Sequence, residues 1–266
     1  MLKTENLHIQ CIYYNIYYTK CKYIGSIIYL LIDIFNLIIY TNTEGQSFKC
    51  EGARLLEPLC DEPFFFAKIL IFCVLCHSGN YLFWWKFMNE LKRNILYNIL
   101  MSENVDDELR DNIDFLISII PEIKDTIGFN QLHPHHHLDV WEHTLDALSR
   151  SKMIFEIRLA LLLHDIGKPH CYQFDGEVNH YRDHNRVSHT IAKNSLENLG
   201  YDGDTINTVC EIILRHDTPI HQGDIDADLK LSQMVFEVQC CDIYAHNPEY
   251  NKKRLEYIDR IAKMLN

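Results

Sequence analysis

The hydrophobic positions of the chain change their pattern near residue 86. Residues 87–266 repeat apolar side chains at intervals of three and four, the spacing of an amphipathic helix. Residues 1–86 contain apolar runs rich in Ile, Tyr, Leu, Phe and Cys instead. We therefore expect an all-α domain over residues 87–266, preceded by a hydrophobic segment without an assigned structure.

Recognisable signals bound the predicted helices. The stretch DELRDNIDFLISII reads as one helix that Pro121 stops. Asp139, with Glu142 three residues later, has the pattern of a capping box before DVWEHTLDALSR. Gly167 and Pro169 close the helix that contains LALLLHDIG.

Three further helices and a terminal one are predicted toward the C-terminus. The first ends at Gly200, the next is capped by Asp204, and the third ends near Pro248. The stretch FDGEVNHY, around Gly176, favours a short hairpin or turn. The terminal helix is NKKRLEYIDRIAKML.

The hydrophobic segment, residues 1–86, carries no chemical motif. Its two apolar runs, residues 26–40 and 64–76, are shorter than the roughly 18 to 20 residues of a spanning helix. Three interpretations stay open: a small accessory domain, membrane-associated hairpins, or a stretch that is not translated because translation starts at Met88 or Met101. We assign the segment no function.

The net charge of −12 comes from the C-terminal two thirds of the chain. Residues 1–86 hold seven acidic and seven basic residues, so 30 of the 37 acids and 18 of the 25 bases belong to residues 87–266. Such a domain is a poor nonspecific binder of nucleic acid, which needs clustered Lys and Arg. A phosphate-bearing substrate would need compensation from bound metal cations.

The ten cysteines form no convincing framework. Six precede residue 77, and Cys73 and Cys76 have CxxC spacing without a second half-site. Core thiols are the favoured interpretation. Since no signal-peptide pattern opens the chain, we expect a cytoplasmic location.

Histidine is concentrated where the helical pattern is regular. Thirteen of the fifteen histidines lie between His133 and His246, and several predicted helices begin or end with one. Imidazole and carboxylate suit Mn, Fe, Co, Ni or Zn. The candidate ligands are His143, His164, Asp165, His184, His216 and Asp242.

His164 and Asp165 follow three leucines at the end of a helix. The apolar LALLL turn would fix that helix in the core and project the pair into a pocket. A buried carboxylate is costly unless a cation compensates it, and Asp165 could bridge two cations. Lys168 would approach the same pocket and hold a phosphate oxygen, or would complement the helix C-terminal dipole.

Other polar residues receive ordinary interpretations. Asp139 is expected to be an N-cap rather than a catalyst. Residues 135–137 are expected to be polar loop side chains, although residues 133–137 could rim the pocket. His189 and His246 are expected at the surface.

Six sequence blocks carry a resemblance to a known family. They are IIPEI (119–123), HPHHHLDVWEHTLDAL (133–148), LLHDIGKP (162–169), HYRDH (180–184), ILRHD (213–217) and CDIYAHNP (241–248). With these blocks, in order over about residues 89–248, the chain resembles the HD-domain superfamily of metal-dependent phosphohydrolases. More particularly, it resembles the HD region of bacterial tRNA nucleotidyltransferases.

The resemblance implies an HD-domain helical bundle that binds a divalent metal ion. His184 and His216 correspond to additional histidines that bind a second metal or the substrate in some members. We expect Asp165, Lys168 and His184 to take part in catalysis. The residues that correspond to the four metal ligands are His143, His164, Asp165 and Asp242.

The chain departs from the nucleotidyltransferases in one respect. Before residue 89 it has no Gly-Ser stretch followed by paired Asp residues, the pattern of the polymerising head. We therefore expect hydrolysis of a phosphomonoester, a cyclic phosphodiester or a nucleotide, and a small phosphorylated substrate rather than tRNA. Two alternatives are a non-catalytic nucleotide-sensing module, disfavoured by the intact ligand set, and a tRNA-processing binding domain, disfavoured by the acidic excess.

Overall fold

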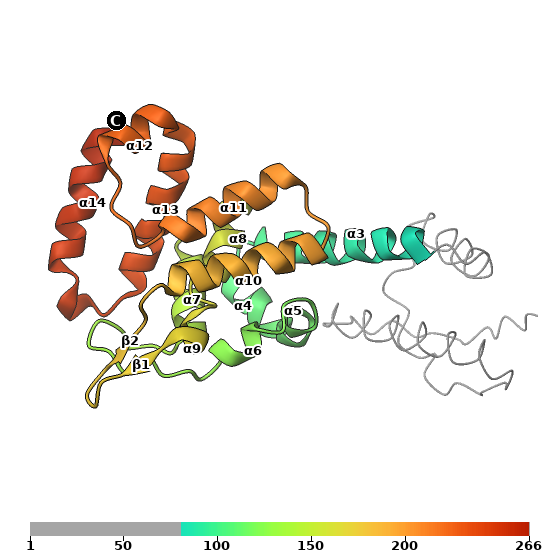
Figure 1. Ribbon diagram of the computed structural model, residues 1–266, viewed down its shortest axis with the longest axis horizontal. Coiled ribbons are helices and arrows are strands. Elements are labelled where there is room, and N and C mark those ends of the chain that lie inside the picture. The colour runs from blue at the N-terminus through green and yellow to red at the C-terminus, as the bar shows by residue number, and fades with distance from the viewer. Residues whose placement is uncertain (1–80, 266) are drawn as a thin grey trace, which may run out of the picture. The chain divides into compact units, whose positions relative to one another are not determined.

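The computed structural model describes residues 81–265 (Figure 1). The apolar runs at residues 26–40 and 64–76, with the interpretations attached to them, lie outside the described residues. The elements are α3 (Tyr81–Leu100), α4 (Val105–Asp111), α5 (Ile113–Ile119), α6 (Ile123–Thr126), α7 (Val140–Ser149), α8 (Phe155–Leu163), α9 (Lys168–Cys171), β1 (Gln173–Phe174), β2 (Asn179–His180), α10 (His184–Asn198), α11 (Gly203–Arg215), α12 (Gln222–Ala227), α13 (Leu229–Ala245), η3 (Pro248–Tyr250) and α14 (Lys252–Leu265).

The regular secondary structure of residues 81–265 is helical apart from one short hairpin, which confirms the predicted all-α class. In the hairpin, β1 and β2 pair antiparallel, with Gln173 opposite His180 and Phe174 opposite Asn179. This is the turn region that FDGEVNHY predicted. Between residues 81 and 265, none of the helices combines the length and apolar character needed to cross a bilayer.

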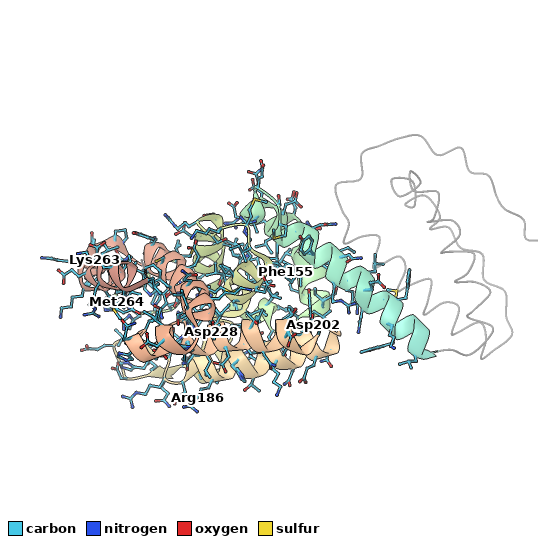
Figure 2. The ribbon with its side chains drawn as sticks, turned by 90° about the horizontal axis from the view of Figure 1, so that it is seen from above. Phe155, Arg186, Asp202, Asp228, Lys263 and Met264 are labelled. Carbon is cyan, nitrogen blue, oxygen red and sulfur yellow. The ribbon has the colours of Figure 1, made fainter. Side chains whose placement is uncertain are left out.

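Helix α8 lies at the centre of the bundle. Every residue from Ile157 to Leu163 is buried, and the helix packs against α7, α11 and α13. A helix that is apolar on all sides is stable only when neighbours surround it. Helix α10 lies along α11 on the outer side, and Arg186 on α10 points away from the bundle (Figure 2). The C-terminal end of α8 is thereby held rigidly in the core.

Two helix boundaries differ from the sequence prediction. The stretch DELRDNIDFLISII is divided into α4 and α5 at Asn112, whose side-chain amide donates to the Glu108 carbonyl at 2.8 Å. Such a local hydrogen bond competes with the helical one and favours a break. Helix α11 is capped by Asp202, which accepts from the Thr205 N–H, so the assignment of the cap to Asp204 was wrong.

Candidate metal centre

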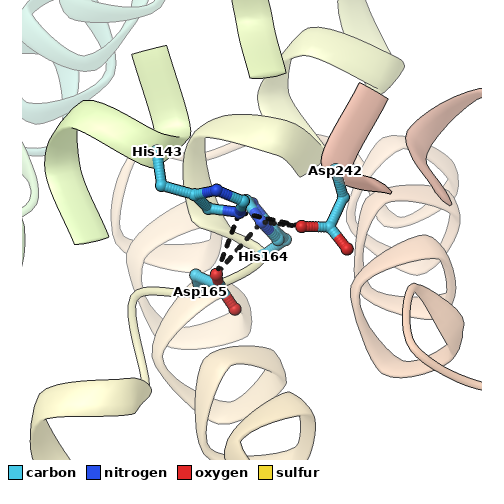
Figure 3. Close-up of side chains that lie close together, drawn as sticks. All are labelled: His143, His164, Asp165 and Asp242. Carbon is cyan, nitrogen blue, oxygen red and sulfur yellow. Dashed lines mark hydrogen bonds and ion pairs between the residues drawn. The ribbon is translucent and has the colours of Figure 1, made fainter. Parts of the chain in front are cut away.

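Four predicted ligands, hereafter the first group, lie close together in the interior of the helical bundle (Figure 3). His143 lies in the first turn of α7, His164 caps the C-terminus of α8, Asp165 follows it, and Asp242 lies near the end of α13. His143 Nε2 is 2.8 Å from Asp242 Oδ1, and His164 Nε2 is 3.3 Å from Asp165 Oδ2. All four residues are buried.

Asp165 also faces a second group, formed with His184 and His216. His184 is the first residue of α10 and His216 caps the C-terminus of α11. Their Nε2 atoms are 3.3 Å and 3.7 Å from Asp165 Oδ1. Asp165 Oδ2 faces His143 and His164 instead, so its two oxygens point to different groups, as in a bridging carboxylate.

Backbone carbonyls orient three of the imidazoles. His164 Nδ1 is 2.7 Å from the Leu161 oxygen, and His216 Nδ1 is 2.6 Å from the Ile213 oxygen. His184 Nδ1 is 2.9 Å from the carbonyl three residues before it. A carbonyl can only accept, so each Nδ1 carries a proton and each Nε2 of a neutral ring presents a lone pair.

The inward-facing atoms fit a cation and are poorly satisfied without one. The Nε2 atoms of His184 and His216 are 3.1 Å apart, and both face Asp165 Oδ1. His164 Nε2 and Asp165 Oδ1 are buried without a hydrogen bond, whereas Asp165 Oδ2 has the ammonium of Lys168 at 2.6 Å. An unsatisfied buried polar group costs about 1–3 kcal/mol. Since imidazole and carboxylate are suitable ligands, each group could hold a divalent metal ion.

The protonation states of the ligands differ. Burial opposes a charge on His164, but Asp165 and Asp242 raise its pKa to about 10, so a bound metal ion would displace a proton from this ring. Burial alone would raise the pKa of Asp165, but His164 and Lys168 hold it well below its usual value. Burial, together with the charges of His164 and His184, lowers the pKa of His216 to about 4. An ionised carboxylate and a neutral imidazole are the forms that bind metals.

Lys168 lies beside the shared carboxylate. Its Nζ is 2.6 Å from Asp165 Oδ2 and donates a hydrogen bond to Gln131 Oε1 at 2.8 Å. The ammonium is buried and lies 5.6 Å from the centre of the Tyr181 ring. Lys168 is the first residue of α9, and its ammonium faces Asp165. This position favours a role of Lys168 in the pocket over an interaction with the C-terminal dipole of α8. Nothing in the sequence pattern pointed to Gln131.

Members of both groups line a pocket of about 510 Å³, within the size range of small-molecule sites; they are Asp165, His184, His216 and Asp242. Several cationic side chains line it, although the whole chain has a net charge of −12. The pocket therefore offers positive charges beside its acidic side chains. These cationic side chains are Lys168, Arg182, Lys253 and Arg254.

Two further histidines lie beside the first group. The prediction that His246 lies at the surface was wrong, because it is 6 % exposed and its Nδ1 is 2.7 Å from the Asp242 carbonyl oxygen. His136 was expected to be a polar loop side chain that could rim the pocket, and its ring lies 4.4 Å from that of His246 and 5.4 Å from that of His143. Both line the pocket. The i, i+4 spacing of Asp242 and His246 was the available signal for the first.

Comparison with known proteins agrees with this geometry. Residues 135–258 match the sequence model of a family described as the HD domain. These residues are therefore similar to an HD domain. This confirms the resemblance on which the four-ligand prediction depended, and HD domains form a superfamily of metal-dependent phosphohydrolases.

Two curated relatives match part of the chain. A CC-adding tRNA nucleotidyltransferase of Thermus thermophilus is 35 % identical over 115 residues, which are 41 % of this chain and 26 % of the relative. An A-adding tRNA nucleotidyltransferase of Deinococcus radiodurans is 29 % identical over 115 residues, with the same shares. The chain thus spans about a quarter of the length of the curated relatives it matches.

Proposed function

We propose that the HD domain is a divalent-metal-dependent phosphohydrolase that acts on a phosphomonoester, a cyclic phosphodiester or a nucleotide. The observation that carries the proposal is the set of imidazole Nε2 atoms of His164, His184 and His216 that face Asp165. The cationic side chains that line the same pocket are a second support, because phosphate oxygens require such partners.

The two groups would hold one cation each. When bound, such cations supply Lewis-acid chemistry, which polarises a phosphoryl oxygen and acidifies a water molecule. Asp165 belongs to both groups and would be a ligand of both cations. The ligands proposed for the first cation are His143, His164, Asp165 and Asp242, and those proposed for the second cation are Asp165, His184 and His216.

Lys168 and His184 would orient the phosphate from two sides of Asp165. The ammonium has three N–H donors, of which one goes to Gln131 and one faces Asp165. The remaining donor is available for a substrate oxygen. His184 lies on the Oδ1 side with a side chain that is partly exposed to the pocket, so it can bind a second cation or contact the substrate directly.

The direct test is an assay of the purified chain loaded with Mn, Co or Ni. The substrates are a generic phosphate ester such as p-nitrophenyl phosphate and the 2′,3′-cyclic nucleotides, and the control is Asp165→Ala. We expect metal-dependent product formation that the variant lacks. Activity no higher than that of Asp165→Ala across the panel would contradict the proposal. Elemental analysis of the native protein would identify the metal.

The names of the two relatives favour one second candidate, a tRNA-binding domain. The 30 acids and 18 bases of residues 87–266 oppose it, since phosphate neutralisation needs clustered cations. A tRNA shift assay over a salt series distinguishes the two. Binding that weakens steeply with salt would support tRNA recognition, whereas tight nucleotide binding without product would support a sensing module.

A further inference from the structure

Arg254 is a cation of the pocket to which the proposed metal sites give no role. It lies in α14 and lines the same pocket as Asp242 and His246. Its Nη1 is buried without a hydrogen-bond partner, and within residues 81–265 the guanidinium forms no ion pair. A guanidinium stays charged at any physiological pH, so its buried N–H donors need an acceptor.

Asp242 does not supply that acceptor. Burial lowers the pKa of the Arg254 guanidinium, and the charge of Asp242 only partly offsets this effect. The Oδ1 atom of Asp242 is already 2.8 Å from His143 Nε2. A cation bound by the first group would engage Asp242 further and leave Arg254 without an opposing charge.

The pocket that Arg254 lines contains a second unsatisfied buried polar atom. His136 Nδ1 is buried without a hydrogen-bond partner, and its ring packs on His246. Lys168 and Arg254 line the same pocket as these two imidazoles. The pocket therefore has a cation from α9 and a cation from α14, and an anion bound there would have both as partners.

We propose that Arg254 binds a non-bridging phosphate oxygen of the substrate, with His136 as a second donor, and that it favours phosphomonoesters. The inference rests on the proposed hydrolase function for the nature of the anion. A phosphomonoester carries three non-bridging oxygens and close to two negative charges, whereas a cyclic diester has two such oxygens and one charge. The cations and Lys168 would also bind non-bridging oxygens, so the third oxygen is the one that Arg254 would bind. The planar guanidinium matches the arrangement of phosphate oxygens.

The first test measures binding of inorganic phosphate to the metal-loaded protein by titration calorimetry, which needs no turnover. Arg254→Gln is expected to weaken binding about 10- to 100-fold, the effect of one hydrogen bond between charged partners. Its matched control is Arg260→Gln, which removes the same charge from the exposed side of α14, where Arg260 lies over the Tyr257 ring. The control is expected to change binding less than about twofold.

Unchanged phosphate binding in Arg254→Gln would overturn the proposal, as would loss of metal from that variant. If Arg254→Gln does not fold, the titration is made with Arg254→Met, and failure of both to fold would assign Arg254 a structural role and also overturn it. The hydrolase function can fail by absence of turnover while phosphate binding still depends on Arg254, so the two failures are distinguishable.

The second test compares two substrates in an active enzyme. In Arg254→Gln, kcat/KM for a phosphomonoester should fall about tenfold more than kcat/KM for a 2′,3′-cyclic nucleotide. An equal fall for the two substrates would contradict the preference.

Discussion

Two His-Asp pairs end two neighbouring helices, and the structure uses them differently. His164 and Asp165 follow α8, and His216 and Asp217 follow α11. Both histidines cap their helix through an Nδ1 contact with the carbonyl three residues earlier. Asp165 is buried between the two ligand groups, whereas Asp217 is exposed and accepts a hydrogen bond from Asn185 at 3.2 Å.

The residue two positions after each aspartate accounts for part of this difference. Gly167 follows Asp165 and donates its N–H to Ser188 Oγ at 2.9 Å. A Cβ atom at Gly167 would lie 2.6 Å from the Ser188 nitrogen and 2.7 Å from the His184 oxygen, both backbone atoms of α10. Only glycine therefore lets α10 approach closely enough to bring His184 to Asp165 and to cover it.

Asp217 is followed by exposed residues instead. Thr218 and Pro219 lie at the pocket surface and lead to α12. The dipeptide thus fixes the histidine by the same capping geometry in both places, while the following residues decide whether the aspartate is buried. A His-Asp pair alone is weak evidence of a metal centre for this reason.

The largest expected effect is that of Asp165→Asn, which tests the inner pair. The amide keeps the size of the side chain but removes the charge that both groups share. We expect metal affinity to fall at least about 100-fold at both sites, since even residues that only orient ligands are worth about 10–100-fold. Turnover should fall on the order of 1000-fold, because Lewis-acid catalysis is worth several kcal/mol. Elemental analysis after dialysis checks this, and full retention of metal would contradict a bridging role.

A smaller effect separates the two capping histidines. His164→Asn and His216→Asn each replace the Nδ1 donor by an amide donor and remove the Nε2 ligand atom. We expect a loss of metal affinity of about 100-fold for His164→Asn and about 10-fold for His216→Asn. His164 belongs to the fully buried group, whereas the group of His216 includes the partly exposed His184, where water can replace a ligand. Competition with a fluorescent chelator measures both affinities; the reverse order would contradict the ranking.

The approach of α10 is tested by Gly167→Ala. The added Cβ would meet backbone atoms that cannot move independently, so we expect a loss of about 1–3 kcal/mol in the free energy of unfolding. The matched control is Gly203→Ala in the first turn of α11, where nothing lies within 4 Å of the added Cβ. The control should change stability by less than about 1 kcal/mol. Equal denaturation midpoints for the two variants would show that α10 does not rest on Gly167.

Local signals in the sequence predicted the parts of the site that local structure fixes. The leucine run before His164 indicated a rigid, buried helix end, and the Asp139 cap was correct because the Glu142 N–H is its partner at 2.9 Å. Asp242 was different, since no local pattern selects it among the polar residues of α13. Its place in the set of four metal ligands was predicted through the family resemblance.

The contribution of α14 to the pocket could not be predicted in the same way. Its sequence is that of an ordinary amphipathic helix with charged residues on several sides, and Arg254 resembles Arg260 in that pattern. Which of the two is half buried depends on how α14 packs against α13 after the turn at residues 248–250. The burial of His136 likewise depends on a loop that reaches His246 across more than a hundred residues.

The smallest expected effect is that of Asp217→Asn, which tests the outer pair. The exposed carboxylate contacts Asn185 and no ligand group, so we expect an unchanged metal content and a change of unfolding free energy within about 0.5 kcal/mol. Loss of a negative charge at the pocket makes the local potential more positive, so KM for an anionic substrate should fall. Screening by salt limits the decrease to less than about threefold, and it should shrink as ionic strength rises. If this variant lost metal as Asp165→Asn is expected to, the two His-Asp pairs would be equivalent, and burial by α10 would not be what distinguishes them.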